Sequence, residues 1–128
     1  MVRLIIVTAT LLLSSYIAIG QVAKDSLKFH KTGIYTYKDK YNEVFIKRTR
    51  TKQIEYNKDK SKVLVLNIKW VSDDEYWLTF IKEKNFPGCL KKGYILKSKI
   101  TYADRNQFSC KYESDHCGNG EATFIKIE

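Results

Sequence analysis

Hydrophobic and polar positions alternate along most of the chain after residue 30. In the segment KVLVLNIKW, residues 62–70, every second residue is large and apolar: Leu64, Leu66, Ile68 and Trp70. A period of two is the pattern of a β-strand that turns one face toward a core. The segment therefore predicts a strand.

The same pattern recurs in seven further segments. They are residues 33–38, 43–49, 52–57, 76–81, 93–102, 107–112 and 122–127. Polar turns rich in Asp, Asn and Gly separate most of them. Strands joined by short turns pair with their neighbours, so we expect an antiparallel meander of about eight strands. The predicted fold class is all-β, closing as a small barrel or a sandwich.

The first 20 residues have a different pattern. Arg3 is followed by a run without charge over residues 4–20, and the next segment is dense in lysine. A positive start, an apolar stretch and small residues at its end are the features of an export signal, here with cleavage expected before Gln21. A retained membrane anchor is the alternative, but the run is short and interrupted by threonine and serine. We expect a signal peptide at residues 1–20.

The remaining chain reads as one unit. A lead segment at residues 21–29, either a short helix or disordered, precedes a single β domain at residues 30–128. The sequence has no Pro/Gly/Ser-rich linker and no internal repeat. We therefore expect an exported protein without a transmembrane span in its mature form, located in the periplasm, on the outer membrane or outside the cell.

The charge balance is basic, with 23 Lys and Arg against 14 Asp and Glu. Lysines occur in nearly every segment, next to acids in KDKYNE, NKDKSK and IKEK. Nucleic-acid binders concentrate positive charge on one face or arm, so we expect no nucleic-acid partner. The spread favours affinity for an anionic component of the cell envelope, or for a protein partner.

Arg48 and Arg50 are the candidate residues for a specific anion contact. One residue separates them in the run KRTRTK, so they fall on the same side of a strand. The alternative is an exposed sheet edge that its charges keep soluble. In both cases the two side chains are expected on the surface.

Three cysteines occur in the second half of the chain. The meander brings the loops at residues 82–93 and 113–120 to the same end, and an exported protein meets an oxidising compartment. We expect a disulfide between Cys89 and Cys117, with Cys110–Cys117 as the nearest alternative. Cys110 lies on the inward phase of its strand, where it would serve as a small buried hydrophobe.

His116 beside Cys117 raises the question of a metal or nucleophile site. Adjacent His and Cys side chains diverge, and no fourth ligand at a zinc-like spacing is present. A thiolate nucleophile needs an orienting base, and neither His116 nor His30 has a catalytic context. Hydrolase, P-loop and metalloprotease motifs are missing from the sequence. We expect neither a metal, a cofactor nor catalysis.

Several stretches carry a resemblance to known proteins. They are FHKTGIYTY at residues 29–37, the run from Arg50 to Asn57, IKWVSDDEYWLTF at residues 68–80 and the closing FIKIE. With these the chain resembles small uncharacterised exported β-rich proteins of Bacteroidetes-type bacteria. The resemblance implies an all-β, lipocalin-like or sandwich module in the cell envelope, and no activity. Members often carry cysteine where this chain has Asp74, so the resemblance transfers no disulfide pairing.

Together these features predict a non-catalytic exported protein of the cell envelope that binds an anionic glycan, a lipid or a partner protein. Two alternatives remain open. One is a small envelope thiol protein or enzyme that uses Cys110 or Cys117 with His116. The other is a structural subunit.

Overall fold

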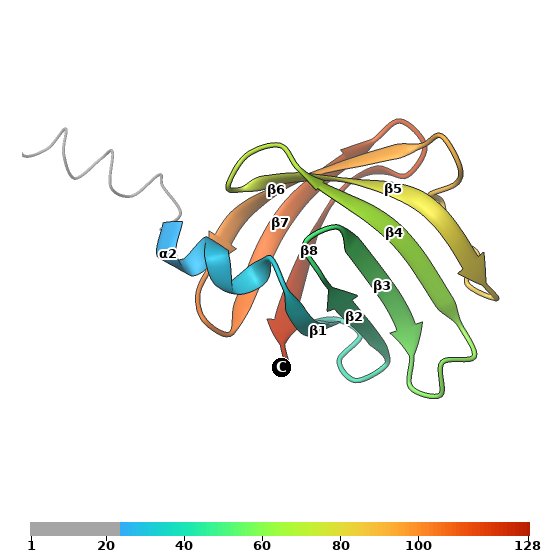
Figure 1. The fold of residues 1–128 in the computed structure, drawn as a ribbon, viewed down its shortest axis with the longest axis horizontal. Coiled ribbons are helices and arrows are strands. Elements are labelled where there is room, and N and C mark those ends of the chain that lie inside the picture. The colour runs from blue at the N-terminus through green and yellow to red at the C-terminus, as the bar shows by residue number, and fades with distance from the viewer. Residues whose placement is uncertain (1–23) are drawn as a thin grey trace, which may run out of the picture.

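A computed structural model describes residues 24–128, and the predicted signal peptide lies outside the described residues. A short helix α2, Lys24–Leu27, and a 3₁₀ helix η1, Lys28–His30, come first (Figure 1). Of the two states expected for the lead segment, its described part is therefore helical. Within residues 24–128 we find no helix with the length and apolar character required to cross a membrane.

Eight strands follow and form one closed barrel (Figure 1). They are β1 (Gly33–Tyr37), β2 (Val44–Arg48), β3 (Lys52–Asn57), β4 (Val63–Trp70), β5 (Glu75–Lys84), β6 (Ile95–Ala103), β7 (Gln107–Ser114) and β8 (Gly118–Lys126). Each strand pairs antiparallel with the next, and β8 pairs antiparallel with β1. The predicted all-β meander is confirmed, and of the two predicted architectures the chain forms the barrel.

One detail of the predicted alternation is wrong. The alternation in residues 93–102 predicts Tyr102 on the same inward face as Ile100, but the side chain of Tyr102 is 49% exposed. The pairing of β6 with β7 shifts register between Ile100 and Tyr102, and Ala103 then lies opposite Phe108. A bulge of this kind adds one residue to a strand and reverses the facing of those beyond it.

The antiparallel order gives the barrel two different ends. The turns after β2, β4 and β6 lie at the same end as η1, which we call the helix end. The loops after β1, β3, β5 and β7 lie at the other, the loop end. At the helix end Leu27 and His30 are buried. The ring Nε2 of His30 donates a hydrogen bond to the backbone oxygen of Asp104 in the turn after β6, so the lead segment closes this end.

The interior is filled by alternate residues of the strands. Aromatic rings form its centre, with Phe108 stacked on Phe124 at 4.5 Å and edge-on to Tyr35 at 5.5 Å between ring centroids. Burial of each such side chain contributes roughly 1.5–3 kcal/mol to folding. The buried hydrophobic residues are Leu27, Tyr35, Ile46, Leu64, Leu66, Ile68, Tyr76, Leu78, Leu90, Ile100, Phe108, Cys110 and Phe124.

Candidate functional site

Arg48 lies inside the barrel and not on its surface, so the expectation of an exposed side chain is wrong. It is 2% exposed. Its Nε and Nη2 donate to Gln53 Oε1 at 3.2 and 2.6 Å, and its Nη1 donates to the backbone oxygen of His30 at 3.1 Å. The guanidinium carbon also lies 4.5 Å from the ring centroid of Tyr76. These contacts give Arg48 a structural role at the helix end.

Arg50 is exposed in the turn between β2 and β3. The structure therefore does not bring the two arginines together on one surface. The alternation within β2 could have predicted that Arg48 is buried. Ile46 and Arg48 share one phase of β2 while Phe45 and Lys47 share the other, so an inward Ile46 places Arg48 inward as well.

A second polar group, the Glu55 carboxyl, is also buried in the barrel. It is 8% exposed, and Tyr37 Oη donates to its Oε1 at 2.6 Å. Burial raises the pKa of Glu55, against the lowering effect of hydrogen bonds from Tyr37 and Gln53 and of the Arg48 charge. Burial, and then the Glu55 charge, raise the pKa of Tyr37 well above its usual value. Arg48, Gln53, Glu55 and Tyr37 thus form one polar network within the packed interior.

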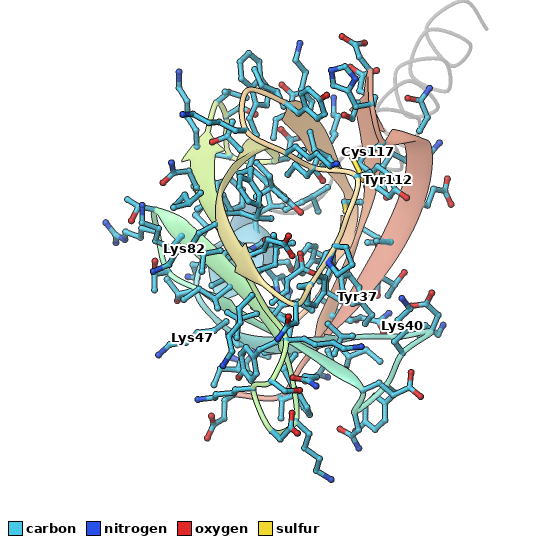
Figure 2. The ribbon with its side chains drawn as sticks, turned by 90° about the vertical axis from the view of Figure 1, so that its right-hand side faces the viewer. Tyr37, Lys40, Lys47, Lys82, Tyr112 and Cys117 are labelled. Carbon is cyan, nitrogen blue, oxygen red and sulfur yellow. A yellow bond between two sulfur atoms is a disulfide. The ribbon has the colours of Figure 1, made fainter. Side chains whose placement is uncertain are left out.

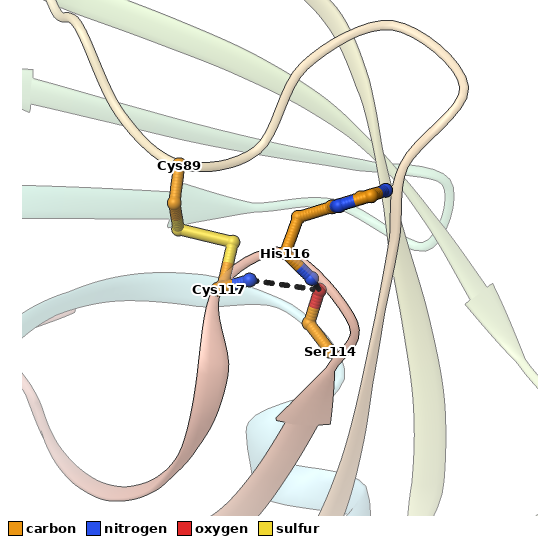
Figure 3. Close-up of a disulfide and its surroundings, with 4 residues drawn as sticks. All are labelled: Cys89, Ser114, His116 and Cys117. Carbon is orange, nitrogen blue, oxygen red and sulfur yellow. Dashed lines mark hydrogen bonds between the residues drawn. A yellow bond between two sulfur atoms is a disulfide. The ribbon is translucent and has the colours of Figure 1, made fainter.

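The predicted disulfide between Cys89 and Cys117 is present, with the two Cα atoms 5.2 Å apart (Figure 3). It fastens the loop after β5 to the tight turn after β7. Leu90, next to Cys89, is buried against the core, so this loop packs over the loop end of the barrel. Cys110 is a free, buried cysteine, and Tyr76 Oη donates to its Sγ at 3.8 Å.

His116 is also occupied structurally. Its ring packs on Tyr94 with 3.5 Å between centroids. The backbone N–H groups of His116 and Cys117 donate to Ser114 Oγ at 3.4 and 3.3 Å (Figure 3). Among the side chains that the structure describes, we find no group of three or more His, Cys, Asp or Glu residues able to hold a metal ion. In this oxidised form, the only free thiol among the described residues is Cys110.

The outer face of β5–β8 carries a groove with a volume of about 680 Å³, which we call the β5–β8 groove. The strand register aligns most of its lining residues in two cross-strand rows. The first row is Trp77, Lys97, Glu113 and Asn119. The second row is Glu75, Lys99, Lys111 and Glu121. Pockets of about 300–1,000 Å³ are the usual size for binding small ligands.

The groove combines one aromatic ring with charges of both signs. Trp77 is half-buried, and the Nζ atoms of Lys97 and Lys69 lie 4.7 and 5.9 Å from its ring centroid. Lys111 forms an exposed ion pair with Glu121 at 3.7 Å. A ring beside carboxylates, ammonium groups and an amide offers stacking, hydrogen-bond acceptors and donors within one site. As a purely structural feature, the same rows are cross-strand pairs on a solvated sheet.

Reasoning from sequence did not single out these groove residues. They occupy the outward phase of four separate strands, which the alternation shows. Only the pairing register places Trp77 beside Lys97 and Lys99 beside Lys111.

Comparisons of the chain with protein-family models, with curated proteins and with solved structures found no match. The resemblance to exported β-rich proteins of Bacteroidetes-type bacteria therefore stays a prediction.

Proposed function

We propose that this protein is an exported, non-catalytic binding protein of the cell envelope, and that its β5–β8 groove binds an anionic glycan. The observation that carries the proposal is the groove itself, in which Trp77 lies at one end of a row of lysine, glutamate and asparagine side chains. A sugar offers an apolar ring face, hydroxyl groups and, when anionic, an acidic substituent. The groove has a matching group for each.

Each part of the ligand has a partner in this arrangement. The sugar ring stacks on the Trp77 indole, since an aromatic ring buries a flat apolar face without losing a hydrogen bond. Hydroxyl groups donate to the carboxylates of Glu75 and Glu113. Acidic substituents pair with Lys97 and Lys99, where the net charge of +9 on the whole chain adds a general attraction.

Export is supported by the signal-like pattern of residues 1–20, by the resemblance and by the Cys89–Cys117 disulfide, which suits an oxidising compartment. The test is the intact mass of the protein recovered from the cell envelope or the medium, with and without reduction. We expect a chain that starts at Gln21 and contains one disulfide. A chain that keeps Met1 and accumulates reduced in the cytoplasm contradicts the proposal.

Binding is tested by calorimetric titration with oligosaccharides of alginate, polygalacturonate and chondroitin sulfate, and with neutral dextran oligosaccharides. We expect an acidic saccharide to bind and Trp77→Ala to weaken this binding at least tenfold, because tryptophan is among the residues whose truncation costs the most binding energy. The control is Lys47→Ala, an exposed residue on the outer face of β2. If no acidic saccharide binds, or if both variants bind equally, the groove is not a glycan site.

A further inference from the structure

A second outer surface of the barrel, on β2–β5, differs from the groove in composition. Its middle is apolar and partly exposed, with Phe45 and Tyr56 stacked at 5.8 Å between ring centroids. The register aligns one row of Phe45, Tyr56, Val63 and Lys84, and a second row of Lys47, Ile54, Val65 and Lys82. We call these eight residues the β2–β5 face.

The charge on this face has one sign. Lys47, Lys82 and Lys84 are exposed at its edges, and Lys60 Nζ lies 5.3 Å from the ring centroid of Tyr56. The next row toward the helix end adds Lys52 and no carboxylate, since it continues through Asn67, Thr79 and Ile95. Figure 2 shows Lys47 and Lys82 on the same side of the barrel, away from Tyr112 and Cys117.

The face is therefore an apolar strip with lysines on both sides, about 14 Å wide across four strands. The ion pairs found between described side chains include Lys31–Asp73 and Lys111–Glu121, and none of them uses Lys47, Lys82 or Lys84. The groove differs because each of its rows contains glutamate as well as lysine. Both sets of eight residues contain three lysines, but only the rows of the β2–β5 face contain no carboxylate.

We propose that the β2–β5 face docks on the surface of an anionic lipid bilayer. Each lysine near such a surface adds to the electrostatic attraction between the protein and the lipid headgroups. The apolar strip enters the headgroup region while the lysine stems lie along it and hold their ammonium groups at the phosphates. An acidic protein would need carboxylates fixed opposite each lysine, whereas lipid headgroups move laterally to meet them.

This inference is independent of the proposed glycan binding. The β2–β5 face and the β5–β8 groove occupy different walls of the barrel and meet only at β5. A protein that rests on a bilayer through β2–β4 holds β6–β8, and with them most of the groove, away from the lipid. Glycan binding by the groove and lipid binding by the β2–β5 face can therefore be tested in separate experiments.

The test is co-sedimentation of the exported protein with vesicles of phosphatidylcholine alone, and with an equimolar mixture of phosphatidylcholine and phosphatidylglycerol. We expect binding to the mixed vesicles only, weakening as salt screens the lysines. The double variant Lys47→Glu with Lys82→Glu is expected to bind at least tenfold more weakly. Because both residues are exposed, we expect the double variant to keep the melting temperature of the unchanged protein. This measurement shows that the variant remains folded.

The matched control is Lys97→Glu with Lys111→Glu, which makes the same change of net charge on the β5–β8 face. All variants keep the same N-terminus. A difference in vesicle binding between the two double variants is therefore caused by the face on which the lysines were replaced. The control is expected to bind the mixed vesicles like the unchanged protein. Equal loss in both doubles, no binding to the mixed vesicles, or displacement by soluble glycerophosphoglycerol would each overturn the proposal.

Discussion

Arg48 and Gln53 are direct cross-strand partners in the β2–β3 pair, and the guanidinium of Arg48 donates two hydrogen bonds to the Gln53 side-chain oxygen. A third bond, from Nη1, reaches the backbone oxygen of His30 in η1. One side chain therefore ties two strands to the segment that closes the helix end. The planar fork of donors in arginine makes this possible, and lysine cannot replace it.

We expect Arg48→Met to lower the free energy of unfolding by about 3 kcal/mol, because it leaves Gln53 Oε1 and a backbone oxygen buried without donors. The measurement is urea unfolding followed by tryptophan fluorescence. Arg50→Met is the control and is expected to stay within about 0.5 kcal/mol, since Arg50 is exposed in a turn. Similar losses in the two variants would contradict the structural role of Arg48.

We expect the free energy of unfolding to depend on pH through the buried carboxyl group of Glu55. Burial raises its pKa above the usual 4.5, so the folded chain holds the proton more tightly than the unfolded chain does. The stabilising effect of this proton is complete below pH 4.5 and is lost as the pH rises through the folded pKa. We expect Glu55→Gln to unfold much like the unchanged protein at low pH and to gain stability relative to it as the pH rises. The measurement is the difference in unfolding free energy over a pH series, and a constant difference would contradict the prediction.

The buried ring of His30 changes the stability of the fold with pH in the opposite direction to Glu55. Burial lowers its pKa below the usual 6.5, only partly offset by its hydrogen bond to the backbone of Asp104. The folded chain therefore keeps the ring neutral, and the stability this provides is present above pH 6.5 and lost as the pH falls toward the folded pKa. His30→Gln removes the titration, so its loss of stability on acidification is expected to be smaller over this range. Parallel curves for the two proteins in thermal melts would disprove this.

The Cys89–Cys117 disulfide closes a loop with a sequence separation of 28 residues. The chain-entropy relation gives about 3.5 kcal/mol of stabilisation for a loop of this length. We expect the double variant Cys89→Ser with Cys117→Ser to lose about that much unfolding free energy. The unchanged protein with reductant should unfold like the variant. A persistent difference between the two would show that the serine side chains, and not the missing bond, cause the loss.

The accessibility of the Cys110 thiol distinguishes the proposed binding protein from the alternative, a thiol enzyme. It is 3% exposed, and a nucleophilic thiol has to be accessible. We expect no alkylation by iodoacetamide of the native, non-reduced protein and one modified cysteine per chain after unfolding. Rapid modification of the native form would favour the thiol alternative. Intact mass spectrometry gives both counts.

The alternation of hydrophobic residues determined much of the fold. It located all eight strands, because each strand packs one face on a common core and so repeats every second residue. The loop positions of Cys89 and Cys117 followed from the same meander, since antiparallel strands bring alternate loops to one end. Two register shifts were exceptions, one beyond Ile100 in β6 and one between Phe80 and Lys82 in β5. One extra residue reverses the facing of Tyr102 and of Lys82 without leaving a mark in the composition.

Tertiary structure decided what alternation leaves open. The pairing of β8 with β1 selected the barrel over the sandwich, and this choice depends on long-range hydrogen bonds that no local pattern encodes. Register aligned Trp77 with Lys97 in the groove and gave Lys47 and Lys82 apolar cross-strand partners without a carboxylate, although acids neighbour lysines along the chain. Arg48 went inward because the interior supplied Gln53 and a backbone oxygen to satisfy its charge, a condition that exists only once β2, β3 and η1 have come together.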